Sequence, residues 1–398
     1  GVNIHNYEFL KGNEMVNKLK VRASYGRTGK ASFPAYAATT MYEALFDEWY
    51  ATGFGAVLKA LGNNNLTWEK TDKFNVGIEM QFLNRRLTVD ADYYHDKTID
   101  LVNDVSLSQT SGFSSYKDNM GEVLNQGFEL QVRGEVFRNR DWLVALWGNM
   151  AHNKNKILKI SDSQRAYNQR VKEFYENIVN EEYGRYNSKY GVPISQYEEG
   201  QSLTSIWAVK SLGIDPTTGK EIFLNRDGSV SDTWNATQEV AVGNTEPKFN
   251  GSIGFNAAYK QWSLFAAFQY EWGGQEYNQT LVDRVENARI QYQNVDLRVL
   301  TDRWKQPGDI AQFKDIKNAD SATMPTSRFV QDKAYLRLSA LTLSYDFNRE
   351  WIKKYLGMNM LRLEASTRDF INWNSIRQER GLSYPKSWTV DFSIKAQF

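Results

Sequence analysis

Few residue types in this sequence could carry out covalent or metal chemistry. The 398 residues include no cysteine and only three histidines, His5, His95 and His152, which lie far apart along the chain. Without thiols the sequence excludes disulfides, thiolate zinc sites and cysteine nucleophiles. Widely separated histidines also argue against a multi-histidine metal site. We therefore expect no catalytic residue, no metal site and no bound cofactor.

The remaining motifs lack the spacing that catalysis or nucleotide binding requires. Neighbouring carboxylates such as Glu198 and Glu199 could be glycosidase acids, but 47 acidic residues give no reason to select two of them. Residues 213–220 have the wrong glycine spacing for a phosphate-binding loop and are typical of a turn. An enzyme, such as a hydrolase, is therefore a weak alternative.

Aromatic and charged side chains also occur in segments without strand periodicity. A rigid aromatic ring is easily desolvated, so it suits contact with a sugar ring or a peptide side chain. The predicted substrate contacts are Trp49, Trp207, Trp234, Arg303, Trp304 and Asp309. For any single residue, packing of the loops on one another is at least as good an explanation.

Charge and hydrophobicity narrow the class of protein. The formal net charge is +1, which excludes a nucleic-acid binder that depends on its overall field. No apolar run reaches the roughly 20 residues of a membrane helix. The first residues contain neither a basic leader nor an apolar core, and we expect that they begin inside a longer protein. A soluble protein or a membrane β-barrel remains.

Alternation of apolar and polar residues predicts strands with two different faces. Residues 73–82 and 387–398 alternate without exception, and eight further segments alternate less strictly, which gives about ten strands. The eight are residues 19–26, 87–107, 120–136, 142–159, 246–260, 262–274, 331–347 and 357–373. The predicted lipid-facing side chains are Phe74, Val76, Ile78, Met80, Val390, Phe392 and Ile394. The predicted lumen-facing side chains are Glu79, Gln81, Asp391, Ser393 and Lys395.

The connections between these strands alternate strictly between long and short. The long ones are residues 28–69, 108–119, 160–245, 275–330 and 374–386, and two of them have apolar residues at helical spacing, over 167–178 and 281–299. A soluble sandwich has no reason to place every long loop at one end, whereas outer-membrane barrels do so. We therefore predict an all-β transmembrane antiparallel barrel whose long extracellular loops contain short helices.

Several blocks together resemble the C-terminal part of SusC/RagA-type TonB-dependent transporters from the Bacteroidetes outer membrane. They are LKVRASYGRTG (19–29), NNLTWEKTDKFNVGIE (64–79), VDADYYHDKTIDL (89–101), GEVLNQGFEL (121–130), VGNTEPKFNGSIGF (242–255), DRWKQPGD (302–309), YLRLSALTLSYDF (335–347) and the strand that ends at Phe398. The resemblance covers nearly the whole chain. It departs from the family at residues 369–371, Asp-Phe-Ile in place of the usual Asn-Leu-Phe, and we expect no loss of fold there.

The resemblance implies that residues 1–398 form about the last ten strands of a 22-stranded barrel, with the plug domain and the N-terminal strands absent from this chain. It implies a multi-pass outer-membrane protein that takes up oligosaccharides or peptides and catalyses no reaction. The implied protein partners are a SusD-like lipoprotein and TonB, which acts through the missing N-terminal region. The plug domain and the remaining barrel strands would contact this chain within the same barrel. The chain would also contact the oligosaccharide or peptide substrate and outer-membrane lipid, and no nucleic acid.

A secreted β-rich glycan-binding module is the alternative function. Such a module would share the aromatic and polar composition, but it does not explain why long and short connections alternate. Extraction separates the two possibilities, because the module would be soluble without detergent.

Overall fold

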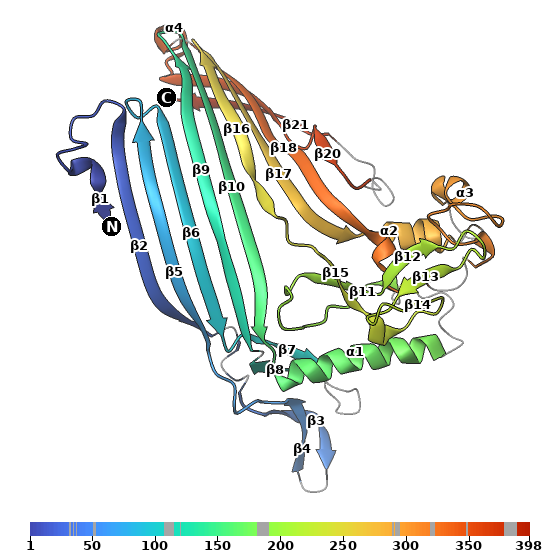
Figure 1. The fold of residues 1–398 in the computed structure, drawn as a ribbon. Helices are drawn as coiled ribbons and strands as arrows, with labels where there is room; N and C mark the ends of the chain where they lie inside the picture. Colours follow the sequence, from blue (N-terminus) through green and yellow to red (C-terminus); the bar gives the residue numbers. More distant parts are fainter. Residues whose placement is uncertain are drawn as a thin grey trace.

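The structure is a computed structural model of the chain. It describes residues 1–31, 33–34, 36, 38–50, 53–106, 115–119, 121–180, 191–288, 290, 295–318, 323–347, 349–377 and 388–398. One large antiparallel sheet forms a curved wall, and a body of folded loops lies at one end of it (Figure 1). No helix among the described residues combines the length and the apolar character needed to span a membrane.

Ten long strands follow one another across this sheet in chain order. They are β2 (Val16–Lys30), β5 (Glu69–Phe82), β6 (Leu87–Ile99), β9 (Glu122–Arg138), β10 (Trp142–Lys159), β16 (Phe249–Tyr259), β17 (Trp262–Tyr277), β18 (Val330–Asp346), β19 (Met360–Thr367) and β21 (Val390–Gln397). Two short strands, β1 (Val2–Asn3) and β20 (Asn372–Asn374), complete it. The ten predicted strand segments are therefore confirmed.

Two of those segments are interrupted by an aspartate. Residues 87–107 divide into β6 and β7 (Val102–Ser106) around Asp100, whose φ is +58°. Residues 357–373 divide into β19 and β20 around Asp369, whose φ is +56°. Aspartate tolerates the left-handed region, where a strand cannot continue. After Asp100 the chain leaves the wall, and β7 pairs with β8 (Ser115–Asn119) in a separate hairpin.

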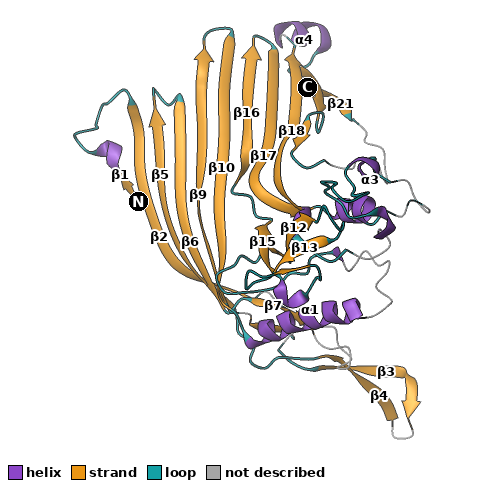
Figure 2. Cartoon of the chain, turned by 45° about the vertical axis from the view of Figure 1, so that its right-hand side comes forward, coloured by secondary structure: helices purple, strands orange, loops and turns teal. Residues whose placement is uncertain are grey.

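The connections separate the two ends of the wall. Short connections, residues 83–86, 139–141 and 260–261, lie at one end together with residues 347–359, which contain α4 (Arg349–Leu356), and the C-terminus lies at the same end (Figure 1). The described parts of the long connections lie toward the opposite end (Figure 1). Figure 2 shows that the wall is entirely strand, while the helices lie in connections and near the start of the chain. The predicted alternation of long and short connections is confirmed.

The pairing register aligns polar residues with polar residues and apolar residues mainly with apolar residues across the wall. Starting from Glu79, residues paired in register are Lys20 on one side and Asp90, Gln131, Asn149, Ser252, Gln269 and Arg337 on the other. The next row, through Ile78, contains Val21, Ala91, Leu130, Met150, Gly251, Tyr270 and Leu336. One face is thus polar and the other mainly apolar, as the alternation predicted.

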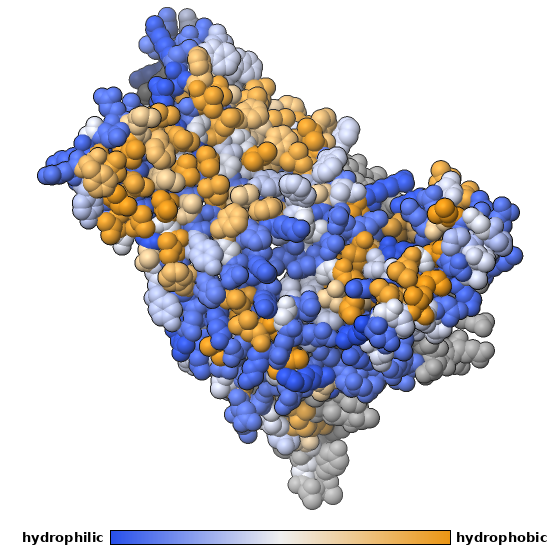
Figure 3. Space-filling model, viewed as in Figure 1, coloured by the Kyte–Doolittle hydropathy of each residue, from blue (hydrophilic) through white to orange (hydrophobic). Residues whose placement is uncertain are grey.

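The apolar face is widely exposed. A hydrophobic band crosses the strands between the hydrophilic short-connection end and the hydrophilic loop body (Figure 3). Phe392 is 81% exposed, and aromatic pairs mark the short-connection edge: the ring centroids of Trp142 and Tyr259 are 4.3 Å apart, and those of Trp262 and Tyr345 are 4.8 Å apart. Such a band with an aromatic border is typical of a protein surface that faces lipid.

The loop body contains its own small sheets and short helices. Its strands are β3 (Met41–Tyr50), β4 (Gly53–Ala60), β11 (Ser205–Ala208), β12 (Lys210–Ile214), β13 (Glu221–Leu224), β14 (Val230–Ser231) and β15 (Val240–Asn244). Its helices are α1 (Asp162–Asn180), α2 (Gln279–Leu281), the π-helical η6 (Val282–Glu286) and α3 (Arg298–Thr301), with 3-10 turns η5 (Ala236–Gln238), η7 (Ile316–Asn318) and η8 (Ser327–Phe329). A further turn, η1 (Ile4–Asn6), follows β1.

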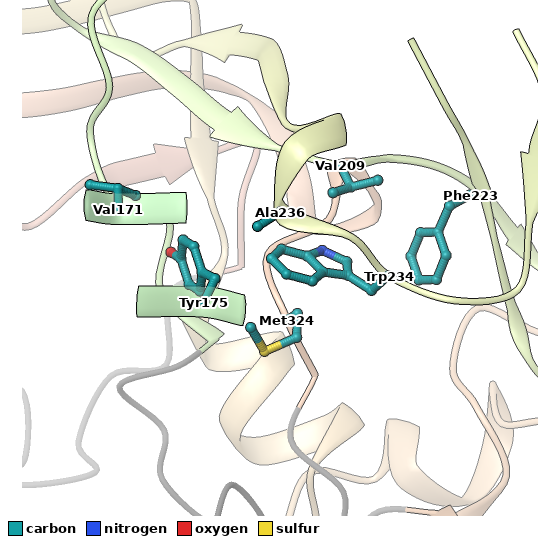
Figure 4. Packing of buried hydrophobic residues seen from close by; sticks show 7 residues of the cluster. All are labelled: Val171, Tyr175, Val209, Phe223, Trp234, Ala236 and Met324. Atoms are coloured by element: carbon teal, nitrogen blue, oxygen red, sulfur yellow. The ribbon is translucent and has the colours of Figure 1, made fainter. Parts of the chain in front are cut away.

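Two buried clusters hold the loop body together. In the first, Trp234 packs edge-on against Tyr175 of α1, with ring centroids 5.4 Å apart (Figure 4). In the second, Val285 and Val299 pack with Phe329. The predicted helix over 167–178 is confirmed as part of α1. The stripe predicted over 281–299 is described in part: Leu281, Val285, Ala288 and Val299 are buried as expected, and Tyr292 lies outside the described residues. Where it is described, the segment forms the short elements α2, η6 and α3.

Candidate functional site

Asparagine side chains on the polar face of the wall form hydrogen bonds to the loop body. Asn155 of β10 accepts the backbone N–H of Leu203 at 2.8 Å through Oδ1, while its Nδ2 donates to Asn125 of β9 at 2.8 Å. The neighbouring inward residue, Asn153, accepts the hydroxyl of Tyr94 at 2.9 Å and donates to Glu246. Because an amide side chain both donates and accepts hydrogen bonds, one row of asparagines can bond to neighbouring strands and to the loop body at the same time.

A large hollow lies where β16 leaves the wall. The last described pair between β10 and β16 is Ala151 with Asn250, whereas β10 continues to Lys159. Residues just before β16 form β15, which pairs with β11 instead. The resulting hollow has a volume of about 990 Å³, and its mixed border includes the polar residues Asn153, Glu246 and Lys333. Its size and position at the mouth of the wall suit the entry of a polar solute.

A buried group of charges supports the next part of the loop body. The Arg328 guanidinium lies 2.6 Å from Glu286 and 2.8 Å from Glu221, and Glu286 is fully buried. Nearby, burial lowers the pKa of the Lys314 ammonium to about 8. These four residues come from four separate segments, so the charges fix the positions of those segments relative to one another.

Three predicted contact residues have buried side chains. Trp207 is only 1% exposed and lines a hollow of about 480 Å³. Trp234 is buried, lines a smaller hollow of about 260 Å³ and donates its indole N–H to the carbonyl of Pro325 at 3.0 Å. Trp304 is buried and donates its indole N–H to the carbonyl of Pro216 at 2.9 Å. They do not form one binding surface.

The other three predicted residues are also placed by local structure. Arg303 is buried and donates to the carbonyl of Lys314 at 2.8 Å. The Asp309 carboxylate accepts the backbone N–H groups of Lys305 and Gln306, each at 3.0 Å, and so closes a turn. Trp49 belongs to strand β3, and its side chain lies outside the part of the chain that is described. Contact of these six residues with substrate stays a prediction.

The sequence gives no signal for the residues that complete the hollow beside Trp207. Its lining comes from residues 192–195, 203–207 and 276–277, together with Thr245 and Gln279. These segments are far apart in the chain and share no periodicity. No group of histidine, cysteine and carboxylate residues suited to a metal ion occurs among the described residues.

A wall of antiparallel strands that is apolar outside and polar inside, with every long connection at one end, defines an outer-membrane β-barrel protein. Residues 14–367 match the family model described as TonB dependent receptor-like, beta-barrel. The chain belongs to this family. Its members are receptors and transporters rather than enzymes, and they lie in the outer membrane and cross it with strands.

Relatives and solved structures agree with that assignment. The chain is 26% identical to TonB-dependent receptor P3 of Formosa agariphila, over 93% of this chain and 36% of the relative. It is 31% identical to the TonB-dependent receptor SusC of Bacteroides thetaiotaomicron, over 40% of this chain and 17% of the relative. The structure of the RagAB peptide importer in the 'closed-closed' state superposes with a TM-score of 0.78 at 22% identity, covering 100% of this chain and 42% of that one. The resemblance to SusC/RagA-type receptors is thereby confirmed.

Proposed function

We propose that these 398 residues form the C-terminal wall and outer loops of a longer TonB-dependent nutrient transporter. The chain spans 36% and 42% of the length of the first two relatives. Among the described residues, β21 pairs only with β19, and β2 pairs only with β5 and the two-residue β1. A free strand edge in hydrocarbon leaves backbone groups unsatisfied at a cost of several kcal/mol each. Further strands and a plug domain would therefore close and fill the barrel.

In this proposal the loop body captures the nutrient. The single observation that carries it is the position of the hollows, which lie in and beside the loop body at the end of the wall where the connections are long enough to form a pocket. A SusD-like lipoprotein would cover the substrate from outside, and TonB would act through the N-terminal region. Either oligosaccharides or peptides would be imported, and no reaction would be catalysed.

We propose that the six predicted contact residues contribute to substrate binding either directly or by positioning the loops, according to whether their side chains are buried. Trp207 and Trp234 would act by forming the walls of hollows, whereas Arg303, Trp304 and Asp309 would hold the loops in place. Trp49 remains a candidate for direct contact.

Energised uptake tests the proposal. The gene for the complete transporter would be deleted and restored, and uptake of a labelled nutrient mixture would be followed with and without a functional TonB. We expect uptake that requires both proteins, and co-purification of the transporter with a surface lipoprotein in detergent. A protein that is released without detergent and has no effect on uptake would instead favour the secreted glycan-binding module.

A further inference from the structure

The hollow beside Trp207 combines apolar walls with three lining residues, Trp207, Tyr277 and Gln279, that each have a buried polar atom without a described partner. We call it the Trp207 hollow. Its volume of about 480 Å³ lies within the range of roughly 300 to 1,000 Å³ that is usual for small-molecule sites. Its apolar lining includes Val192, Pro193, Ile194 and Leu203. These side chains suit an aliphatic group.

The three polar atoms are one donor, one acceptor and the hydroxyl of Tyr277, which can donate or accept. The indole N–H of Trp207 has no hydrogen-bond partner among the described residues, although the side chain is almost fully buried. Gln279 donates through Nε2 to the carboxylate of Asp283 at 3.0 Å, which fixes its amide orientation. Its Oε1 is then left buried without a described partner. Buried polar atoms are nearly always hydrogen-bonded, so three exceptions among the lining residues of one hollow point to an absent occupant.

A backbone amide has the complementary groups. It offers one carbonyl acceptor for Trp207 and one N–H donor for Gln279, and in a peptide an aliphatic side chain can lie beside it. A sugar ring is a poorer match, because its several hydroxyls each need a partner and its apolar face needs an open aromatic ring. The face of Trp207 is covered, since only 1% of the residue is exposed.

We propose that the Trp207 hollow binds an aliphatic residue of a peptide, with the peptide carbonyl accepting from Trp207 Nε1 and the peptide N–H donating to Gln279 Oε1. This inference rests on the proposed function, in which the loop body captures the nutrient. It names the substrate class that the hollow selects, and it assigns specificity to three segments of the loop body that are distant in sequence.

Binding of a defined peptide tests this inference. The complete transporter, purified in detergent, would be titrated with the probe acetyl-Gly-Leu-Gly-amide, and with acetyl-Gly-Asp-Gly-amide and maltohexaose as comparisons. Val192→Trp places a large ring at the lining of the hollow, where Val192 is 42% exposed. The matched control is Val230→Trp on β14, since Val230 is 60% exposed and is not part of the lining.

The wild-type protein and the Val230→Trp variant should bind the leucine peptide in preference to both comparison probes. Val192→Trp should weaken that binding at least tenfold, and Trp207→Phe, which keeps a ring but removes the N–H, should weaken it several-fold. Equal binding by the Val192 and Val230 variants would overturn the inference. The inference would also be overturned if the transporter bound maltohexaose and if Val192→Trp, but not Val230→Trp, abolished that binding.

Uptake separates the two proposals. If the wild-type transporter still imports nutrient with TonB but does not bind the leucine peptide, only the assignment of the Trp207 hollow fails. If the wild-type transporter imports nothing, the proposed function itself fails.

Discussion

Arg328 Nη2 lies 2.6 Å from Glu286 Oε1, and the same nitrogen lies 2.8 Å from Glu221 Oε2. Arg328 belongs to η8, which leads directly into wall strand β18, whereas Glu286 ends η6 and Glu221 begins β13. One guanidinium therefore joins two parts of the loop body at the point where the chain re-enters the wall. Its planar fork can serve two carboxylates at once, which a lysine could not do with the same geometry.

Removal of this guanidinium should destabilise the loop body. Arg328→Met leaves Glu286 and Glu221 without their shared cation, and breaking a buried pair from one side typically costs about 3 to 5 kcal/mol. Hydrogen exchange over residues 205–329 would measure the loss. Lys220→Met is the control, because the pair of Lys220 with Asp232 is exposed and should contribute little. Equal protection in the two variants would contradict a structural role for Arg328.

Stability of the loop body should fall as pH rises towards 7. Burial raises the pKa of the fully buried Glu239 carboxyl to about 7, although a hydrogen bond from Gln196 opposes the shift. The folded state thus holds its proton more tightly than the unfolded chain, in which glutamate titrates near 4.3. The free energy of unfolding is greatest below about pH 4.3, falls between that pH and pH 7, and then levels off, with a total loss of about 3 to 4 kcal/mol.

Replacement of the carboxyl isolates this effect. Glu239→Gln cannot ionise, so unfolding of the loop body measured from pH 4 to pH 8 should lose the corresponding slope. The variant should exceed the wild type in stability at pH 8. Parallel curves for the two proteins would show that Glu239 ionises in the folded state without this penalty.

Gly219 should be more sensitive to substitution than Gly228. Both have a positive φ, +71° and +86°, so alanine is strained at either position by about 1 kcal/mol or more. A Cβ at Gly219 would also lie 2.6 Å from ring carbons of Trp304, whereas nothing lies within 4 Å at Gly228. Gly219→Ala should therefore displace the indole from its bond to Pro216. Faster exchange of the Trp304 indole proton in Gly219→Ala alone would confirm this, and equal exchange in both variants would contradict it.

The two faces of the wall should tolerate charge differently. Ile253 is 46% exposed near the middle of β16, and the adjacent Ser252 belongs to the polar row. Ile253→Arg should destabilise the assembled barrel by about 2 to 4 kcal/mol, because it places a charge in hydrocarbon. Ser252→Arg, at nearly the same depth, should cost much less. Equal losses in denaturant unfolding of the two variants would show that the faces are assigned wrongly.

The wall was predictable from sequence because strand alternation is a local pattern with a period of two. Residues 73–82 show both faces without any knowledge of their neighbours, and the pairing register simply extends those faces. The interruptions at Asp100 and Asp369 were not predictable in the same way. A single residue in the left-handed region leaves no periodic signal, although aspartate is one of the residues that permits it.

The loop body was much less predictable. Trp207, Trp234 and Trp304 are in the predicted regions, but a list of aromatic residues cannot show whether an indole faces a solute or another loop. Their burial depends on contacts between distant segments, such as the bond from Trp234 to Pro325. The Trp207 hollow likewise exists only after residues 192–195 meet residues 276–277 and Gln279. Contacts between segments that are distant in the chain cannot be predicted from the residue pattern of one short segment.

Cross-linking to the imported nutrient would test most directly whether the loop body captures it. A benzophenone amino acid would be placed in the complete transporter either at Val192, on the Trp207 hollow, or at Trp351, on α4 among the short connections. Cells exposed to a nutrient mixture would be irradiated and the adducts identified by mass. Because benzophenone reacts with C–H bonds of peptides and glycans alike, the measurement does not presuppose the substrate. We predict nutrient adducts at Val192 and none at Trp351; adducts confined to Trp351, or none at Val192 during active uptake, would contradict capture by the loop body.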